Sequence, residues 1–183
     1  MKREKMTDAI DAERLVLFPF TKDNLALFNT DLPAFERAFG VRYYQGEELD
    51  DLLTSFLKRL ENEIAEDPSH YLFFTAFLIV LKESDRIVGS IDFKYPPRDG
   101  VTEVGYGLNP AYVGHGYMTE ALSAFLAFGK TLGIKTVRAD TKPDNVKSQN
   151  VLKRCGFRFL FEDGDLWWEK DLTRPTPERS RPA

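Results

Sequence analysis

Hydrophobic and polar residues recur along this chain with two different periods, which predict its helices and strands. The clearest helix covers residues 47–66, where leucines and other apolar residues recur at helical spacing until Pro68 ends the segment. An earlier helical stretch begins after Thr21, a residue well suited to cap a helix N-terminus. Breaks near Gly40 and Gly46 separate the two stretches.

Strand signals fill much of the remaining chain. Residues 71–81 and 86–95 are rich in β-branched and aromatic residues, and the short turn between them predicts a hairpin. A second hairpin is indicated by Asp163-Gly164, a typical two-residue turn. The other predicted strands cover residues 13–20, 101–108, 134–140, 156–162 and 165–172, and the other predicted helices cover residues 117–132 and 145–154.

This order of elements predicts the fold class. A strand, two helices, three strands, and then a helix, a strand, a helix and two strands make an α/β sandwich with a mixed, mostly antiparallel sheet. The length of 183 residues and the 43% hydrophobic content suit a single domain with a sizeable core. We expect that domain over residues 13–172, between a flexible polar arm at 1–12 and a disordered tail rich in proline and arginine at 173–183.

The most informative stretch joins the strand at 101–108 to the helix that follows. Residues 109–122 read NPAYVGHGYMTEAL, so a loop containing Gly114 and Gly116 leads into an apolar helix. Glycines allow close backbone approach, and a helix N-terminus offers free N–H groups to an anion, so we expect a phosphorylated ligand here. The loop lacks the third glycine of a dinucleotide-binding fingerprint, and the segment 129–131 lacks the first glycine of a P-loop.

The loop resembles the acyl-CoA-binding segment of the GCN5-related N-acetyltransferases (GNAT), which reads Gln/Arg-x-x-Gly-x-Gly/Ala. The six matching positions run from Val113 to Met118; these two residues replace the Gln/Arg and the last small residue of the pattern. Residues 145–157, NVKSQNVLKRCGF, are similar to the family's Asn-x-x-Ser-x-x-x-Leu-x-Lys-x-Gly-Phe segment. The flanking residues look like the RimJ/RimL branch, and the likeness covers roughly residues 13–172.

The resemblance implies a GNAT-type acyl-CoA N-acyltransferase fold, with helices on both faces of the sheet, and acetyl-CoA as co-substrate. It implies transfer of the acetyl group to a primary amine, either a protein N-terminus or a small amine, by direct attack in a ternary complex. By the same resemblance, the residues that would bind the donor are Tyr106, Leu108, Val113, Gly114, His115, Gly116, Tyr117, Met118, Asn145 and Lys153. Asn145 is also a favourable N-cap, and Lys153 is equally consistent with a solvated helix lysine.

Two residues are candidates for proton transfer. Glu103 occupies a strand position where many relatives place a carboxylate, so it is the candidate general base; a solvent-facing strand carboxylate is the alternative. Ser148 matches the motif serine and is the candidate acid, because Leu152 stands where many relatives have a tyrosine; a locally hydrogen-bonded serine is the alternative. Tyr43 and Tyr44 belong to the variable acceptor side and could shape the substrate mouth or simply pack in the core.

Charge and composition limit the other interpretations. A net charge of −4 gives no general attraction to nucleic acid. The only cysteine, Cys155, excludes an internal disulfide and is expected to be a packing residue; two distant histidines and one cysteine do not suggest a metal site. The apolar run 71–81 is too short to span a bilayer, and the N-terminus lacks a leader pattern, so we expect a cytoplasmic protein, either a monomer or a homodimer.

Two rival functions stay open at this point. The missing tyrosine and the missing Gln/Arg are compatible with a non-catalytic module that binds or senses acyl-CoA. A nucleotide-binding protein could use the same glycine loop for its phosphates.

Overall fold

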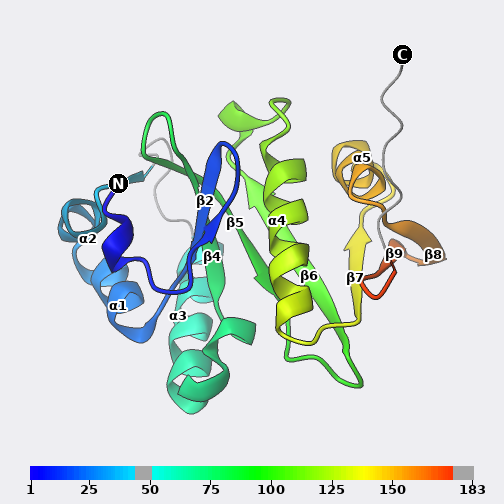
Figure 1. The fold of residues 1–183 in the computed structure, drawn as a ribbon, viewed down its shortest axis with the longest axis horizontal. Helices are drawn as coiled ribbons and strands as arrows, with labels where there is room; N and C mark the ends of the chain where they lie inside the picture. Colours follow the sequence, from blue (N-terminus) through cyan, green and yellow to red (C-terminus); the bar gives the residue numbers. More distant parts are fainter. Residues whose placement is uncertain (44–50, 175–183) are drawn as a thin grey trace.

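The computed structural model describes residues 1–43 and 51–174, and the side chains of residues 51–56 are not described. Within this part, one continuous sheet has the order β1-β2-β4-β5-β6-β7-β9-β8, and β3 pairs with β5 (Figure 1). Its strands are β1 (Ile10–Asp11), β2 (Leu15–Pro19), β3 (Arg42–Tyr43), β4 (Ala76–Leu81), β5 (Arg86–Phe93), β6 (Val101–Leu108), β7 (Thr136–Thr141), β8 (Arg158–Asp163) and β9 (Asp165–Asp171). Among the strands of the described residues, only the β3–β5 and β6–β7 pairs are parallel, so the predicted mixed, mostly antiparallel sheet is confirmed.

Helices cover both faces of this sheet, as the resemblance implied. They are α1 (Lys22–Thr30), α2 (Leu32–Phe39), α3 (Asp51–Glu66), α4 (Tyr117–Thr131) and α5 (Val146–Arg154). Short 3-10 segments cover Arg3–Lys5, Pro68–Phe73 and Pro110–Tyr112. One hydrophobic core joins the sheet to α4 and α5, and a second core joins the opposite face to α1, α2 and α3.

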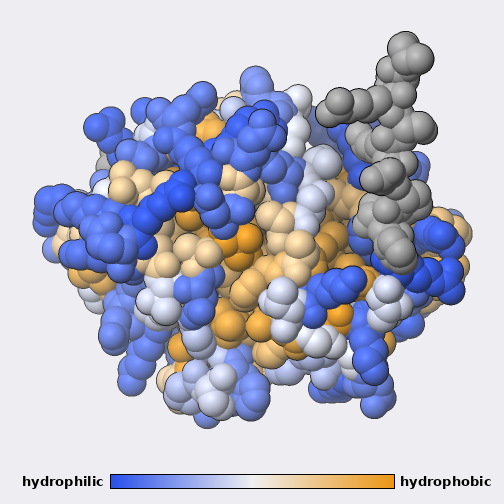
Figure 2. Space-filling model, viewed as in Figure 1, coloured by the Kyte–Doolittle hydropathy of each residue, from blue (hydrophilic) through white to orange (hydrophobic). Residues whose placement is uncertain are grey.

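The alternation of side chains along β4 shows how one strand supplies both cores. Phe77 and Ile79 pack in the core with α4, whereas Leu78 and Val80 pack in the core with α1–α3. Burial on both faces explains why this strand is a continuous apolar run. On the face shown in Figure 2, hydrophobic residues gather around the place where Figure 1 draws α4, and hydrophilic residues surround them.

The sequence misplaced some element boundaries. The first helical stretch is two helices, because Asp31 ends α1 and its carboxylate accepts a hydrogen bond from the Ala34 backbone N–H at 2.8 Å, which caps α2. The strand predicted from residue 71 starts at Ala76, since Pro68–Phe73 forms a 3-10 segment. The two-residue strands β1 and β3 were not predicted, because two residues carry no readable periodicity.

Residues 1–12, which we expected to be a flexible arm, are packed against the domain. The Met6 side chain is buried in the core with α1–α3, and the N-terminal ammonium lies 3.0 Å from Asp85. The Lys2 backbone N–H donates to the Phe39 carbonyl at 2.7 Å. Of the predicted tail, residues 175–183 lie outside the described part of the chain.

Candidate functional site

The site begins where two neighbouring strands separate. β6 and β7 pair from Val101–Thr136 to Glu103–Arg138, and their register records no pair beyond that point. β6 then continues along β5 only, while β7 continues along β9. The end of β6 therefore presents backbone N–H and C=O groups to the gap, where an extended ligand could pair with them.

The loop after β6 has the backbone expected of an anion cradle. Gly114 has a φ of +95° and Gly116, the N-cap of α4, has a φ of +81°, both angles that favour glycine. No atom lies within 4 Å of the position that a Cβ on Gly114 would take. The first N–H groups of α4 have no intrahelical partner and carry the positive end of the helix dipole, so they can bind a phosphate.

An arginine from the opposite end of the chain holds this loop in place. The Arg14 Nε donates to Glu120 Oε2 at 2.7 Å, and its backbone N–H donates to Glu120 Oε1 at 2.6 Å. The guanidinium also donates to the His115 carbonyl at 3.1 Å and lies 4.7 Å from the centre of the Tyr117 ring. Glu120, in the first turn of α4, is thus the anchor of this clamp and is neutralised beside an anion site.

The loop, α4 and α5 enclose a pocket of about 500 Å³, which we call the donor pocket. The predicted residues that line it are Tyr106, Leu108, Val113, Gly114, Gly116, Tyr117, Met118, Asn145 and Ser148. Sequence reasoning missed its two cations, Lys147 and Arg154. Their separation by two helical turns in the predicted helix 145–154 was the available signal, because it places both on one helix face. Glycines, helix N-terminus and cations together fit the phosphates of an acyl-CoA.

Two predicted donor-binding residues do not line the donor pocket. The His115 side chain is exposed and its ring stacks on Tyr117, with 5.6 Å between ring centroids. The Lys153 ammonium lies 5.4 Å from the centre of the Trp168 ring, which fits its alternative as a solvated helix lysine packed on an aromatic. His115 contributes its backbone carbonyl to the contact with Arg14.

Ser148 lies beside the tyrosine of the diverging strand. Its Oγ is 2.9 Å from the Tyr106 hydroxyl, and either group could donate. Burial raises the pKa of Tyr106 to about 12, although the hydrogen bond to Ser148 opposes this shift, so the phenol keeps its proton at neutral pH. The Asn145 side-chain oxygen accepts from the Ser148 backbone N–H at 3.1 Å, which is the N-cap role left open by the sequence.

Glu103 and Ser148 do not line a common pocket. Glu103 is buried, at 8% exposure, and its carboxylate forms an ion pair with Lys94, whose ammonium also lies 2.9 Å from Asp140. It points to the face of β6 opposite Tyr106, since side chains alternate along a strand. Glu103 lines neither pocket described for this site, and Gly107, the nearest pocket residue on the same strand face, is four residues away.

A second carboxylate on that face was not predicted. Asp92 on β5 lies opposite Gly105 in the register, and its Oδ1 would be 3.2 Å from a Cβ added to Gly105. Burial raises the pKa of Asp92 to about 6, which nearby Arg59 and Lys94 only partly offset. The signal available was the pattern Ser90-x-Asp92, polar residues at alternate positions of an otherwise apolar strand.

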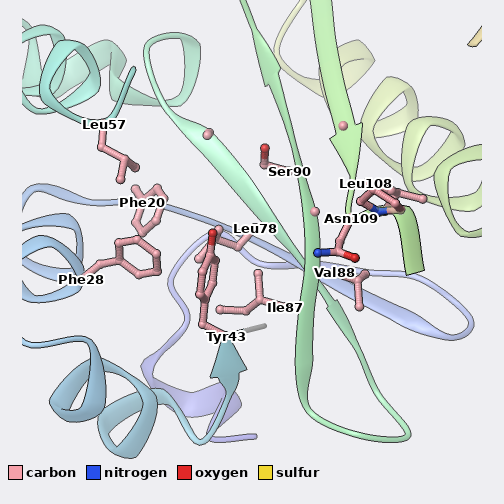
Figure 3. A pocket seen from close by; sticks show the side chains of 14 residues that line it. Phe20, Phe28, Tyr43, Leu57, Leu78, Ile87, Val88, Ser90, Leu108 and Asn109 are labelled. Carbon is pink, nitrogen blue, oxygen red and sulfur yellow. The ribbon is translucent and has the colours of Figure 1, made fainter. Parts of the chain in front are cut away.

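A second pocket, of about 280 Å³, opens on the α1–α3 side of the sheet; we call it the acceptor pocket. Figure 3 shows Phe20, Phe28 and Tyr43 on one side and Leu108 and Asn109 on the other. Tyr43 thus lines this pocket, whereas Tyr44 lies outside the described residues. Gly107 and Leu108 line both pockets, so the two meet at the end of β6.

Residues 1–43 and 51–174 contain neither a cluster of metal-ligating side chains nor a membrane-spanning helix. This part of the chain has no cluster of three or more His, Cys, Asp or Glu side chains arranged to hold a metal ion. In the same residues, no helix combines the length and the apolar character needed to cross a membrane.

The fold and the site together define an α/β protein with an anion-binding loop at a split in its sheet. Comparison with known families makes this specific, because residues 14–158 match the model of the acetyltransferase (GNAT) domain. The chain therefore belongs to the GNAT acetyltransferase family. The fold and family expected from the two sequence motifs are confirmed.

Individual relatives agree with this assignment. The chain is 28% identical to the probable N-acetyltransferase YjcK of Bacillus subtilis over 142 residues, 74% of each chain. It is 30% identical to the uncharacterized N-acetyltransferase YnaD of the same organism over 101 residues, 51% of this chain. The match spans only 59% of the length of YnaD.

Solved structures of similar fold include RimJ-type and RimL-type enzymes. Mycobacterium smegmatis RimJ in complex with CoA-disulfide has a TM-score of 0.64 and 19% identity, over 90% of this chain and 87% of that one. The ribosomal-protein-S5-alanine acetyltransferase of Vibrio fischeri has a TM-score of 0.64 and 19% identity, over 92% and 99% of the two chains. At these identities the likeness shows the shared fold.

Proposed function

We propose that this protein is an N-acetyltransferase that takes acetyl-CoA in the donor pocket and a primary amine in the acceptor pocket. The observation that carries the proposal is that the two pockets meet at Gly107 and Leu108. An amine and a thioester placed on the two sides of this junction can react directly, without a covalent enzyme intermediate. Holding two reactants in attack geometry is itself a large part of catalysis.

Each part of the donor pocket has a role in this proposal. The backbone of the Gly114–Gly116 loop and the start of α4 bind the pyrophosphate, and Lys147 and Arg154 add positive charge. The free edge of β6 pairs with the pantetheine amides. A backbone N–H near Leu108 polarises the thioester carbonyl, because a fixed donor at that oxygen stabilises the charge that develops there.

Proton handling completes the reaction. The amine nitrogen forms a bond to the carbonyl carbon, the carbon–sulfur bond breaks, and the leaving thiolate needs a proton. Ser148 is our candidate donor of that proton, and the hydroxyl of Tyr106, 2.9 Å away, is placed to replenish it. Glu103 stays our candidate base for the amine. It lies four positions from Gly107 along β6, about 13 Å away, so it would act through water.

The acceptor is proposed in general terms as a protein N-terminus or a small amine. One of the structural neighbours named above has a name that specifies a ribosomal protein. Tyr43 supports an acceptor role for the second pocket, because it comes from β3, outside the elements that form the donor pocket.

One observation favours a second candidate, an acyl-CoA-binding module without catalysis. Glu103 is held in an ion pair with Lys94, so its carboxylate is already engaged by another cation. Leu152 is fully buried in the core and offers no acid. The donor pocket would be the same under both candidates, so only turnover separates them.

The deciding experiment measures thiol release from acetyl-CoA with a panel of amines and N-terminal peptides, beside a titration of acetyl-CoA binding. Amine-dependent thiol release, with the acetylated amine confirmed by mass spectrometry, is the expected result. Tight acetyl-CoA binding without turnover across the panel would favour the binding module. Binding of ATP or NAD in preference to acetyl-CoA would contradict both candidates.

A further inference from the structure

The walls of the acceptor pocket have a uniform chemistry. Most of its lining is apolar, and half of the lining residues are apolar and buried; among the described residues none of the lining side chains carries a charge. The apolar lining residues are Phe20, Phe28, Leu57, Ala76, Leu78, Ile87, Val88, Leu108 and Pro110. A charged group entering here would lose its hydration without gaining a partner, whereas an apolar group would gain from burial.

Two polar groups stand close to the junction with the donor pocket. Ser90 lies opposite Gly107 in the β5–β6 register, and within the described part of the chain its hydroxyl has no recorded hydrogen bond. Asn109 follows β6 directly; its side-chain oxygen accepts from the Ala111 N–H at 3.0 Å, which leaves its amide N–H₂ for a ligand. The pocket is thus polar at the junction and apolar beyond it (Figure 3).

We infer that the acceptor is a primary amine whose α-substituent is apolar, with this substituent in the pocket and the nitrogen hydrogen-bonded to Ser90 beside Gly107. The inference rests on the proposed function and narrows its substrate class. A volume of about 280 Å³ lies near the lower end of small-molecule sites, which hold roughly 300–1,000 Å³. The pocket therefore suits one apolar side chain, and the amine that bears it is either a free small molecule or the first residue of a peptide.

The nearest rival is a polyamine or another polycationic acceptor. Asp92 lies two residues beyond Ser90 on the same strand face, and Glu103 is on the neighbouring strand, but neither carboxylate lines the pocket. Glu103 is already paired with Lys94. A polycation would have to place its second ammonium against the apolar wall or reach past it to Asp92. The two substrate classes therefore differ in whether a second positive charge on the acceptor lowers or raises its kcat/KM.

The test uses amino-acid amides that share one α-amine and differ in the side chain: glycinamide, alaninamide, leucinamide and argininamide. Burial of a leucine side chain contributes roughly 1.5–3 kcal/mol, so kcat/KM for leucinamide should exceed that for glycinamide by about 10-fold to 150-fold. Argininamide should be no better than alaninamide. Equal rates for all four amides, or a preference for argininamide, would overturn the inference.

The same series is measured by calorimetric binding to the protein saturated with CoA, which requires no turnover. An apolar ranking in binding without any thiol release would support the pocket chemistry while contradicting the proposed function. No ranking in binding would overturn the inference even if turnover is present. The peptide Leu-Gly-Gly distinguishes the two sources of the amine. If the natural acceptor is a peptide, kcat/KM for Leu-Gly-Gly should exceed that for leucinamide; if it is a small molecule, it should not.

A variant pair tests the assignment to this pocket. Phe28→Leu replaces a lining side chain with a smaller one and so enlarges the pocket, which should shift the preference from leucinamide toward phenylalaninamide. Phe161→Leu makes the same change at an exposed site on β8 and should leave the ranking unaltered. If Phe28→Leu does not fold, Ser90→Ala provides the alternative: it should lower kcat/KM for all amides by a similar factor at unchanged KM for acetyl-CoA. An altered ranking in the β8 variant, or unchanged kcat/KM in Ser90→Ala, would contradict the site.

Discussion

The donor pocket and the acceptor pocket lie on opposite sides of one strand end, yet they are built in different ways. The donor pocket takes most of its lining from two continuous segments, residues 106–119 and 145–154. The acceptor pocket gathers side chains from β3, α1, α3, β4, β5 and the end of β6, which are far apart in the sequence. Backbone geometry defines the first pocket and long-range packing of side chains defines the second.

This difference determines how each pocket should respond to mutation. Donor binding depends on glycine backbones and a helix N-terminus, which few side chains can replace. Acceptor binding depends on apolar walls that can be resized while the fold is kept. Changes on the donor side should therefore remove binding of one fixed ligand, whereas changes on the acceptor side should shift preference between ligands.

The largest effect is expected from Gly116→Trp. A tryptophan at a φ of +81° is strained, and its ring would project beside Arg14, where the phosphates are proposed to bind. Acetyl-CoA binding should be lost, as measured by calorimetric titration. Gly133→Trp is the matched control, because Gly133 is also exposed, has a φ of +82° and has no atom within 4 Å of an added Cβ. Unchanged acetyl-CoA affinity in Gly116→Trp would contradict the donor site.

The junction of the pockets is the next most sensitive point. Gly107 has no atom within 4 Å of an added Cβ and no positive φ, so Gly107→Leu should fold with its side chain at the junction. Because small misplacements of reacting groups can cost about 100-fold, kcat should fall by at least that factor. The kcat of Gly107→Ala should fall by a smaller factor. A Gly107→Leu protein that keeps wild-type kcat with every amine would show that transfer does not occur at this junction.

Variants of the candidate proton donor test the donor pocket without changing its shape. General acids contribute roughly 100-fold to 10,000-fold, so Ser148→Ala should lower kcat by about 100-fold at unchanged acetyl-CoA affinity. Tyr106→Phe keeps the ring and removes the hydroxyl that lies 2.9 Å from Ser148, and it should have a smaller effect. Single-turnover rates with a leucine-type amine measure both variants. Equal kcat in Ser148→Ala and wild type would mean that water, and not Ser148, donates the proton to the thiolate.

The Arg14 clamp should matter only for donors that carry phosphates. Hydrogen bonds to charged groups contribute roughly 1.5–3 kcal/mol, so loss of loop order in Arg14→Gln should raise KM for acetyl-CoA by about 10-fold or more. KM for S-acetylpantetheine, which lacks the pyrophosphate, should not change. Arg3→Gln, which removes a surface pair with Asp11, is the matched control. A similar rise of KM for both donors would mean that Arg14 supports the fold and not the phosphate loop.

The two pockets also differ in how far the sequence could predict them. The glycine loop and the motif at residues 145–157 predicted where the donor pocket lies, because the geometry of this pocket follows from contiguous residues. The side-chain directions on α5 were harder to predict: Lys153 packs on Trp168 while Lys147 and Arg154 line the pocket. Of the acceptor pocket only Tyr43 was anticipated, since no local pattern shows that Phe20, Phe28 and Leu78 will meet.

The fold shows the same division. Long periodic segments gave the sheet and the main helices, and strand β6 matches its predicted range of 101–108. The missed features depend on particular side chains or on tertiary pairing: the cap at Asp31, the 3-10 segment at Pro68–Phe73, and the two-residue strands β1 and β3. The packing of Met6 into the core also depends on contacts with distant residues, so a polar N-terminal composition could not predict it.

The smallest expected effect concerns Asp92, on the acceptor side of the sheet. Burial raises its folded-state pKa to about 6, above its ordinary value, so the folded protein binds this proton more tightly than the unfolded chain. Stability should therefore fall as pH rises from about 4 to about 6 and then level off, by at most about 3 kcal/mol. Asp92→Asn removes this penalty and should be more stable than wild type at pH 8 but not at pH 4, as measured by urea unfolding.

The same variant shows whether this carboxylate takes part in transfer. If Asp92 does not take part in transfer, Asp92→Asn should keep the kcat/KM of the wild type and its pH profile, while Glu103→Gln should lower kcat/KM. If the profile of the wild type instead has an inflection near pH 6 that disappears in Asp92→Asn, the base is Asp92, which lies opposite Gly105 and is thus two residues closer to Gly107 along the strands than Glu103 is. That outcome would assign the role of catalytic carboxylate to a residue that only the folded sheet brings into position, in place of the one chosen from its strand position in the sequence.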